Sequence, residues 1–276
     1  YGDGASERNL GRVLGDLGAD VLVGTKIRVP RGDYGRLAEA IPEGLEASLK
    51  RLGRDSVDLF QLHNAIAPEN SDEALSLRAV LDEVVPAFER LRAKGKIRFL
   101  GITAVGDAAS LQQVISAGAF DTAQVSYNML NPSAGAAVPT GYPAQDYGDL
   151  IGRAQAAGMG VINIRVLAGG ALSGSDARHP IASPPPAPIG SGRDYAADVQ
   201  RARRLAPLVE QGFAADLVEA SLRFSIANAG ISTVLIGMST IAELEHAAAA
   251  VNKGPLAPDA LRQLATLRSG FVGEAR

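Results

Sequence analysis

The chain contains no cysteine and no tryptophan, and aromatic residues of all kinds make up only 5% of its 276 residues. Without cysteine, disulfide bonds, thiolate catalysis and cysteine-ligated metal sites are all excluded, and the composition fits a cytoplasmic protein. The sequence also lacks any apolar run that approaches the ~20 residues of a membrane-spanning helix. We therefore expect neither thiol chemistry nor a membrane partner.

Neither sign of charge dominates, because 27 basic residues and 30 acidic residues give a formal net charge of -3. This balance provides no electrostatic reason to expect a nucleic-acid partner. No cluster of histidine, aspartate and glutamate has the spacing of metal ligands, so we expect no metal site. The sequence does not indicate the oligomeric state.

An initiator methionine is also missing. The chain opens directly on Tyr1-Gly2-Asp3-Gly4, which already reads as the inside of a motif. We therefore expect the numbering to begin partway through a protein, and the lack of a visible signal peptide carries little weight.

Short apolar runs alternate with segments of helical periodicity along almost the whole chain. The runs are continuously apolar, which is typical of strands buried on both faces of a parallel sheet. The expected strands are 21–25, 57–62, 97–102, 122–125, 161–164 and 233–236. The expected helices, which precede, separate and follow these strands, are 10–17, 37–52, 81–94, 108–117, 149–157 and 241–251.

This order predicts a single α/β domain over residues 1–276, with the architecture of a (β/α)8 TIM barrel. A complete barrel needs two strands more than can be read here. We expect the first two βα units, at about 30 residues each, to lie upstream of Tyr1. A doubly wound open sheet is the alternative, but no G-x-G-x-x-G motif follows any of the strands, which counts against a Rossmann fold.

Two segments rich in proline and glycine, 131–147 and 173–195, interrupt the alternation and are predicted to be loops. Loops of this length inside a domain are usually functional or mobile. Both follow the carboxyl ends of predicted strands, where barrel active sites lie. We interpret them as walls or lids of a substrate pocket, with a disordered insertion as the alternative.

Three residues near predicted strand ends carry proton chemistry: Tyr1, Lys26 after the run 21–25, and His63 after the run 57–62. Alone, the lysine could be a solvated loop residue and the histidine a structural one. Neighbouring parallel strands, however, bring their carboxyl ends together. An ammonium group stabilises a phenolate and lowers the tyrosine pKa from ~10. Such a set can protonate a developing alkoxide, but a nicotinamide cofactor must provide the hydride.

Short motifs follow one another in order from the first residue to about Lys253. They are Tyr1-Gly2-x-Gly4-x-Ser6-Glu7, Thr25-Lys26, Gln61-Leu62-His63, Gly95-Lys96-Ile97-Arg98-x-Leu100-Gly101, Gln124-Val125-x-Tyr127-Asn128, Leu167-Ala168-Gly169-Gly170 and Ile236-Gly237. In this order and at these spacings, the chain resembles the aldo-keto reductase superfamily.

The resemblance implies an NAD(P)-dependent oxidoreductase that interconverts a small carbonyl compound and its alcohol on a (β/α)8 barrel. It assigns Tyr1 as the general acid, Lys26 as the partner that lowers its pKa, and His63 as the residue that orients the substrate. The aspartate of the family's catalytic tetrad should lie a few residues before Tyr1 and is not in this sequence.

The resemblance also implies contacts to the nicotinamide half of the cofactor. Gln124 matches the glutamine that holds the carboxamide. Thr103 offers a hydroxyl where the family usually has serine, whereas Ala104 replaces the asparagine beside it. Leu167 and Gly169 lie in a motif of the cofactor-binding region.

Arg165 stands beside Ile164, which replaces the aromatic residue that commonly stacks on the nicotinamide. Its guanidinium suits the cofactor pyrophosphate or an anionic group of the substrate. A salt bridge within the loop is the alternative interpretation of Arg165.

The last expected strand leads through Gly237, Ser239 and Thr240 into a helix, whose first N–H groups favour phosphate. Glu243 replaces the basic residue that many NADPH-using members carry in this helix. A carboxylate repels a 2′-phosphate and accepts a hydrogen bond from a free ribose hydroxyl. We therefore expect NAD or NADP as the cofactor, with NAD favoured.

Two other functions remain open on the sequence alone. One is a cofactor-binding regulatory subunit, since potassium-channel β subunits resemble this family. The other is a barrel isomerase or hydrolase, which the lack of carboxylate pairs and metal ligands in the motifs disfavours. The substrate class also stays open among sugars, lactols and small aliphatic or aromatic aldehydes.

Overall fold

The structure is a computed structural model that describes residues 2–275. The chain groups into two compact units, one formed by residues up to Gln124 with 157–159, and one formed by 125–156 with the residues from Gly160 onward. The prediction of a single domain over 1–276 stays a prediction.

The strands of the first unit are parallel neighbours. β1 (Gly24–Ile27) pairs with β2 (Val57–Leu62), and β2 pairs with β5 (Ile97–Ala104). The register sets Lys26 opposite Gln61 and Gln61 opposite Gly101. β6 (Thr122–Ser126) begins beside β5. The lysine, the glutamine and the glycine therefore occupy equivalent positions on consecutive strands.

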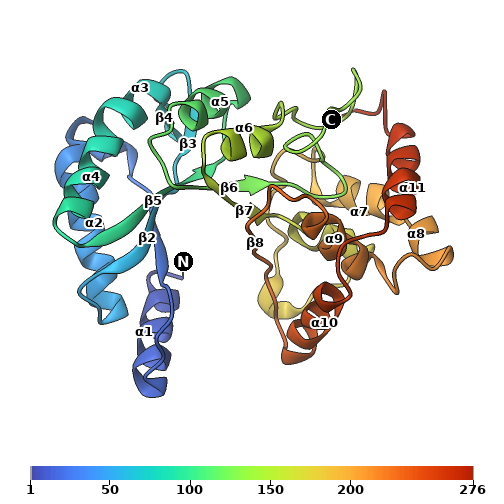
Figure 1. Ribbon diagram of the computed structural model, residues 1–276, viewed down its shortest axis with the longest axis horizontal. Helices are drawn as coiled ribbons and strands as arrows, with labels where there is room; N and C mark the ends of the chain where they lie inside the picture. The colour runs from blue at the N-terminus through green and yellow to red at the C-terminus, as the bar shows by residue number, and fades with distance from the viewer. Residues whose placement is uncertain (1, 276) are drawn as a thin grey trace. The chain divides into compact units, whose positions relative to one another are not determined.

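Helices cover these strands (Figure 1). α2 (Leu37–Leu52) and α4 (Val85–Ala93) pack together, and α4 also packs on β5. The rings of Phe60 and Phe88, both fully buried, lie 4.9 Å apart and join strand to helix. α3 (Leu77–Ala79) and α5 (Ala108–Ser116) complete the helices of this part of the unit.

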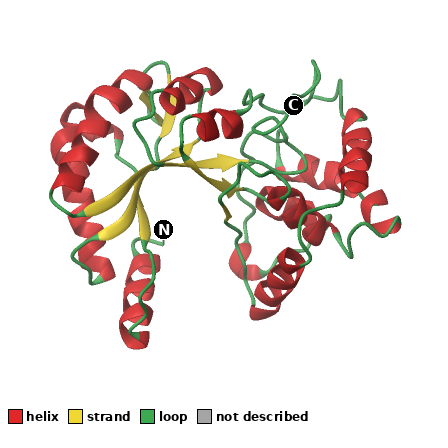
Figure 2. Ribbon diagram, in the orientation of Figure 1, coloured by secondary structure: helices red, strands yellow, loops and turns green. Residues whose placement is uncertain are grey.

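The second unit repeats the parallel βα pattern. β7 (Gly160–Ile164) pairs in parallel with β8 (Thr233–Val234). Val166 and Val234 pack with apolar residues of two helices, which builds a core around β8. The helices of this unit, red in Figure 2, are α6 (Leu150–Ala156), α7 (Tyr195–Arg203), α8 (Pro207–Glu210), α9 (Leu217–Ile226), α10 (Ile241–Asn252) and α11 (Pro258–Ser269).

These pairings confirm the predicted α/β class with parallel strands. Some boundaries differ. The first strand was expected at 21–25, but Val21 and Leu22 are exposed and strand pairing begins at Gly24. Val23, directly before the strand, is buried and bonded to β2: its N–H donates to the Asp58 carboxylate at 2.8 Å, and its carbonyl oxygen accepts from the Asp58 N–H at 2.8 Å.

Two very short strands escaped prediction, β3 (Ala65–Ala67) and β4 (Ala74–Ser76), which pair with each other in parallel. Three residues are too few to show an alternating or continuous apolar pattern. They lie between β2 and α3 and do not carry any predicted site residue.

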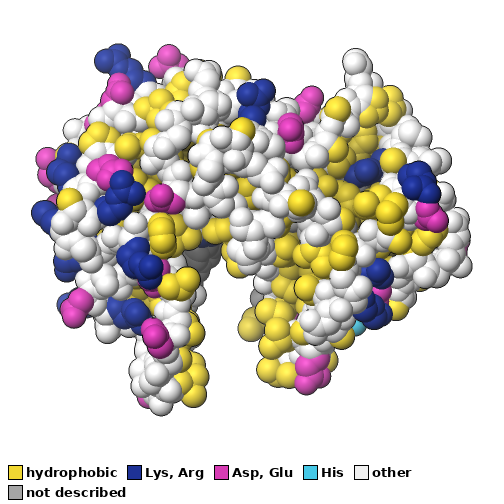
Figure 3. All heavy atoms as spheres, in the orientation of Figure 1, with side chains coloured by type: hydrophobic (Ala, Val, Ile, Leu, Met, Phe, Trp, Pro, Cys, Tyr) yellow, Lys and Arg dark blue, Asp and Glu magenta, His cyan; other side chains and the backbone are white. Residues whose placement is uncertain are grey.

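α1 (Ala5–Leu17) is an amphipathic helix whose apolar side chains remain exposed, as Figure 3 shows. Two kinds of contact attach α1 to the rest of the unit: close backbone packing at Gly11 and hydrogen bonds to the Glu7 carboxylate. Gly11 lies so near Leu52 that a Cβ would fall within 2.4 Å of the Leu52 carbonyl oxygen. Glu7 accepts hydrogen bonds from Thr25 of β1 and Arg51 of α2, each at 2.5 Å.

Candidate functional site

Lys26 and His63 lie at the carboxyl ends of two neighbouring strands, as predicted. The N–H of His63 donates to the carbonyl oxygen of Ile27 at 2.7 Å, so the imidazole directly follows the last paired residue of β2. Lys26 is in register with Gln61, two positions before His63. Because side chains alternate along a strand, all three project from the same side of the sheet.

The imidazole is held by a hydroxyl from the next strand. Nδ1 of His63 lies 2.9 Å from Oγ1 of Thr103, near the end of β5. Thr103 is buried, with 2% of its surface exposed. The sequence predicted this hydroxyl as a cofactor contact, and the structure gives it His63 as a partner.

Burial, together with the positive charges of Lys26 and Arg28, lowers the pKa of His63 to about 4. The imidazole is therefore neutral at pH 7. A neutral imidazole can donate one hydrogen bond and accept one, which suits a group that orients a carbonyl.

Tyr1, the predicted general acid, lies outside the described residues. The motif that follows it is firmly anchored. Burial opposes ionisation of Glu7, but hydrogen bonds from Thr25 and Arg51 outweigh it and hold the pKa of this carboxyl below its usual value. The predicted catalytic residues that the structure describes are thus Lys26 and His63.

Gln61 of β2 and Gln124 of β6 form a pair of buried side-chain amides in the same unit as Lys26 and His63. Nε2 of Gln124 donates to Oε1 of Gln61 at 3.4 Å, and each side chain is 3% exposed. Among residues 2–275, Oε1 of Gln124 and Nε2 of Gln61 have no hydrogen-bond partner. One acceptor and one donor thus remain, which is the complement of a carboxamide. These residues fit the nicotinamide end of the expected cofactor.

Gln61 was not predicted as a site residue. Its signal was present, since it is an uncharged polar residue near the end of the otherwise apolar run Phe60-Gln61-Leu62. Only the pairing of β2 with β5, and of β5 with β6, shows that this amide reaches Gln124.

The second unit contains a cavity of about 810 Å³. Its walls come from the segment after β7, the segment after β8, the start of α10 and the loop 173–195. Predicted cofactor residues that line it are Arg165, Leu167, Gly169, Gly237, Ser239 and Glu243. Thr240 does not line the cavity but caps the helix that does.

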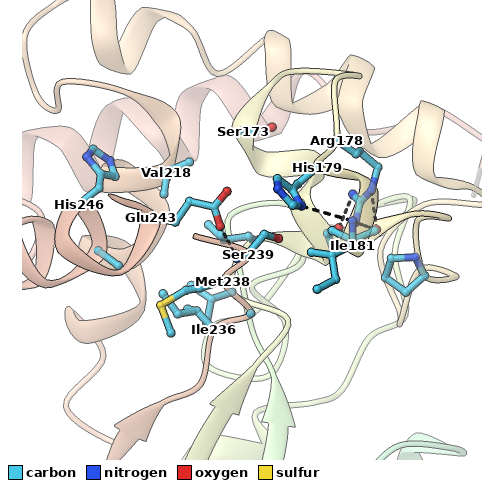
Figure 4. Close-up of a pocket in the computed structure, with 18 of the residues that line it drawn as sticks. Ser173, Arg178, His179, Ile181, Val218, Ile236, Met238, Ser239, Glu243 and His246 are labelled. Atoms are coloured by element: carbon cyan, nitrogen blue, oxygen red, sulfur yellow. Dashed lines mark hydrogen bonds between the residues drawn. The ribbon is translucent and has the colours of Figure 1, made fainter. Parts of the chain in front are cut away.

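Figure 4 shows how two elements face each other across this cavity. Glu243 and His246 belong to α10, whereas Arg178, His179 and Ile181 belong to the loop 173–195. The prediction that this loop forms a wall agrees with its position. In contrast, no residue of 131–147 lines this cavity.

The two ends of the segment 131–147 are instead packed into the second unit, whereas much of its middle, 136–141, is exposed. Asn131 and Tyr147 are buried, and the Asn131 amide donates to the carbonyl oxygens of Gln145 and Gly190 at 2.9 and 2.7 Å. Composition indicated a flexible segment, but backbone carbonyls held by buried side chains give it a defined conformation.

The start of α10 is capped in a manner similar to a capping box, with the carboxylate contact moved to the residue before the N-cap. Oγ1 of Thr240 accepts from the N–H of Glu243 at 3.2 Å, and the Glu243 carboxylate accepts from the N–H of Ser239 at 2.6 Å (Figure 4). A carboxylate therefore already lies against an N–H group that the sequence assigned to phosphate. Negative charge is favoured at this helix end.

Two arginines tie the cavity wall to the loop 173–195. Arg165 donates to the carbonyl oxygen of Ala187 at 3.2 Å, and Arg178 donates to that of Gly169 at 2.8 Å. The Arg178 guanidinium also lies over the Tyr195 ring, 4.9 Å from its centroid. Arg178 was missed from sequence, because only the folded loop brings it to Gly169.

Comparisons with known proteins identify the family. A model of the Aldo/keto reductase family matches residues 1–268. The chain belongs to the aldo/keto reductase family. It is accordingly an NAD(P)-dependent oxidoreductase. Among the described residues, no helix is long and apolar enough to span a membrane.

Several relatives share part of this sequence. L-galactose dehydrogenase of Arabidopsis thaliana is 28% identical over 260 residues, which cover 92% of this chain and 72% of that protein. The methylglyoxal reductase YeaE of Escherichia coli is 32% identical over 131 residues, which cover 47% of this chain and 41% of that protein. The NADH-specific methylglyoxal reductase of Escherichia coli is 33% identical over 93 residues, 34% of this chain and 26% of that protein.

Among solved structures, the holo form of aldo-keto reductase AKR11C1 from Bacillus halodurans superimposes with a TM-score of 0.70 at 21% identity. The match covers 100% of this chain and 81% of that one. It supports the fold of this aldo/keto reductase, including the βα order predicted from sequence.

Proposed function

We propose that this aldo/keto reductase interconverts a small carbonyl compound and its alcohol with a tyrosine as the general acid and base. The observation that carries the proposal is the cluster of Lys26, a neutral His63 and Thr103 at the ends of β1, β2 and β5. Neutral imidazole beside an ammonium group suits a site where negative charge develops on a carbonyl oxygen.

The roles of the residues follow from their chemistry. When bound, the nicotinamide supplies or accepts the hydride. In the reduction, Tyr1 gives its phenolic proton to the oxygen, and the Lys26 ammonium stabilises the phenolate that remains. His63 donates a hydrogen bond that orients the same oxygen. In the oxidation, the phenolate takes the proton from the alcohol.

The cofactor residues divide by the groups they suit. The open acceptor on Gln124 and the open donor on Gln61 match the carboxamide. Arg165 and the start of α10, with Gly237, Ser239 and Thr240, suit phosphate. Leu167 and Gly169 form the cavity wall beside them.

Glu243 supports NAD as the preferred cofactor. Its carboxylate lines the cavity and lies at the Ser239 N–H. A 2′-phosphate in this cavity would meet that negative charge, whereas a free ribose hydroxyl could donate to it. The relative named as NADH-specific is consistent with the same preference.

The names of the relatives suggest which substrates to try first. A relative that covers most of this chain is named for L-galactose, and two shorter matches are named for methylglyoxal. We propose a sugar-like or small α-oxo aldehyde, or the corresponding alcohol or lactol, as the substrate class.

The test combines binding and turnover. NADH and NADPH are titrated by calorimetry, and a panel of sugars, lactols and small aldehydes is assayed in both directions. We expect NADH binding and turnover, with Tyr1→Phe and Lys26→Met removing turnover while nucleotide affinity stays within about threefold. Binding without turnover on the whole panel would favour the regulatory-subunit alternative, and no binding of either nucleotide would contradict the proposal.

A further inference from the structure

The hydrogen bond between His63 and Thr103 decides which imidazole nitrogen carries the proton. Nδ1 of His63 and Oγ1 of Thr103 lie 2.9 Å apart, so one of the two groups donates to the other. A neutral imidazole has one N–H and one bare nitrogen, and a hydroxyl can act as donor or acceptor. The distance alone does not give the direction.

The burial of Thr103 gives the direction. Only 2% of its surface is exposed, so its hydroxyl proton needs an acceptor inside the protein. His63 is the partner that the described part of the chain provides for this hydroxyl. If Nδ1 carried the proton, the Thr103 oxygen would accept from it and the hydroxyl proton would be left without an acceptor. Thr103 therefore donates to a bare Nδ1.

The strand register makes this contact a rigid one. Gln61 of β2 is paired with Gly101 of β5, and His63 and Thr103 each follow two positions later on their strands. The hydroxyl thus lies on backbone that the sheet itself positions. Ile102, between the glycine and the threonine, is fully buried and fixes the strand further.

The charges around His63 favour the same state. Lys26 and Arg28 disfavour the imidazolium form, as does burial. With the ring neutral and Nδ1 accepting from Thr103, its single proton resides on Nε2. His63 then presents a donor, and not an acceptor, on the nitrogen that Thr103 does not contact.

We propose that Thr103 is a positioning residue whose hydroxyl fixes His63 in the tautomer protonated on Nε2, so that His63 donates to the substrate oxygen. The last clause rests on the proposed function. The hydroxyl still has lone pairs that can accept from a carboxamide, so this role is compatible with the predicted cofactor contact.

The experiment reads the tautomer directly by nitrogen-15 NMR of the full chain labelled at its three histidines. His63 is assigned by the loss of its signals in His63→Gln. We expect the Nε2-protonated pattern at neutral pH in the parent protein and in Thr103→Ser, which keeps the hydroxyl. Thr103→Val, which replaces the hydroxyl with a methyl group, is expected to give a mixture of tautomers.

Kinetics provide a second readout. Thr103→Val should lower kcat by about twofold or more, since about half of the neutral imidazoles or more then present no donor, while Thr103→Ser stays close to the parent. Thr122→Val is the matched control, because it removes a buried hydroxyl on the adjacent strand that has no partner in residues 2–275. Melting curves of all variants show whether each one folds.

The outcomes separate this inference from the proposed function. A parent His63 protonated on Nδ1, or an unchanged tautomer in a folded Thr103→Val, overturns the positioning role even if the enzyme is active. If the expected tautomers are observed but the protein turns over no carbonyl compound with either nucleotide, the positioning role of Thr103 is confirmed and the proposed function is wrong. If Thr103→Val does not fold, the parent and Thr103→Ser spectra still decide the tautomer.

Discussion

His63 shows at the residue scale how environment changes the chemistry of a side chain. Its usual pKa of 6.5 would leave it partly charged near neutral pH, but burial and two cations lower that pKa to about 4. The folded protein therefore resists protonation that the unfolded chain accepts. This difference links folding stability to pH.

Lowering the pH should therefore reveal the effect of the His63 pKa on folding stability. Between about pH 6.5 and pH 4 the unfolded state binds a proton at His63 that the folded state does not, so the free energy of unfolding falls as the pH drops through this window. His63→Gln should lose less stability than the parent over the same window. Urea unfolding at several pH values measures the slopes, with His179→Gln as the control. Equal slopes for His63→Gln and the parent would contradict the shifted pKa.

Glu243 carries a second residue-scale prediction, on cofactor choice. Replacing the carboxylate with an ammonium group, Glu243→Lys, removes repulsion and adds attraction for a 2′-phosphate. We expect the affinity ratio of NADPH to NADH to rise about tenfold or more, which corresponds to ~1.4 kcal/mol. Calorimetry measures both affinities. Glu245→Lys makes the same charge change on α10 at a residue outside the cavity lining and should leave the ratio nearly unchanged.

At the scale of elements, β5 has to approach β2 and β6 closely. A Cβ on Gly101 would lie 2.5 Å from Oγ1 of Thr122 and 2.7 Å from Cγ of Gln61. Neither atom is the free end of a long side chain. The glycine is therefore part of what holds the Gln61 and Gln124 amides in place.

Gly101→Ala should consequently overpack this region, with a loss of ~1–3 kcal/mol in the free energy of unfolding. Displacement of Gln61 should also weaken NADH binding. Chemical denaturation and calorimetry measure the two effects. Gly32→Ala, at a position where a Cβ would meet nothing within 4 Å, is the control. A Gly101→Ala variant as stable as this control would show that the strands separate at little cost.

α1 is an element held more by polar contacts than by burial, since none of its residues is buried. Glu7 connects it to Thr25 and Arg51, and its lowered pKa means that this stabilisation is lost as the pH falls through that pKa. Glu7→Gln should accelerate hydrogen exchange in α1 at neutral pH and leave α9 unchanged. If exchange in α1 did not change, packing at Gly11 would be sufficient to hold the helix.

At the scale of the whole molecule, nucleotide binding should be visible as stability. A ligand that binds only the folded state adds about 2.7 kcal/mol at a concentration of 100 times its Kd. We expect NADH to raise the melting temperature more than NADPH at equal concentration, because Glu243 lines the cavity. Glu243→Lys should reverse this order. A larger shift with NADPH in the parent would contradict the NAD preference.

Many strands and helices of this protein could be predicted from sequence because they depend on local residue patterns. The largely apolar run at 57–62 and the helical periodicity at 37–52 match β2 and α2 to the residue. Lys26 and His63 were placed correctly because parallel strands align their carboxyl ends. Family motifs led from these elements to an NAD(P)-dependent oxidoreductase, which the family match confirms.

Tertiary structure decided what depends on partners distant in the chain. Thr103 was predicted as a cofactor contact, which stays a prediction, and the register between β2 and β5 adds a hydrogen bond of its hydroxyl with His63. Gln61 joins the candidate site only through its contact with Gln124, 63 positions away. The contact of Arg178 with Gly169 and the packing of the two ends of 131–147 arise from loop conformation, which composition does not specify. Sequence patterns report local periodicity, whereas hydrogen-bond partners and pKa shifts depend on which side chains the fold brings together.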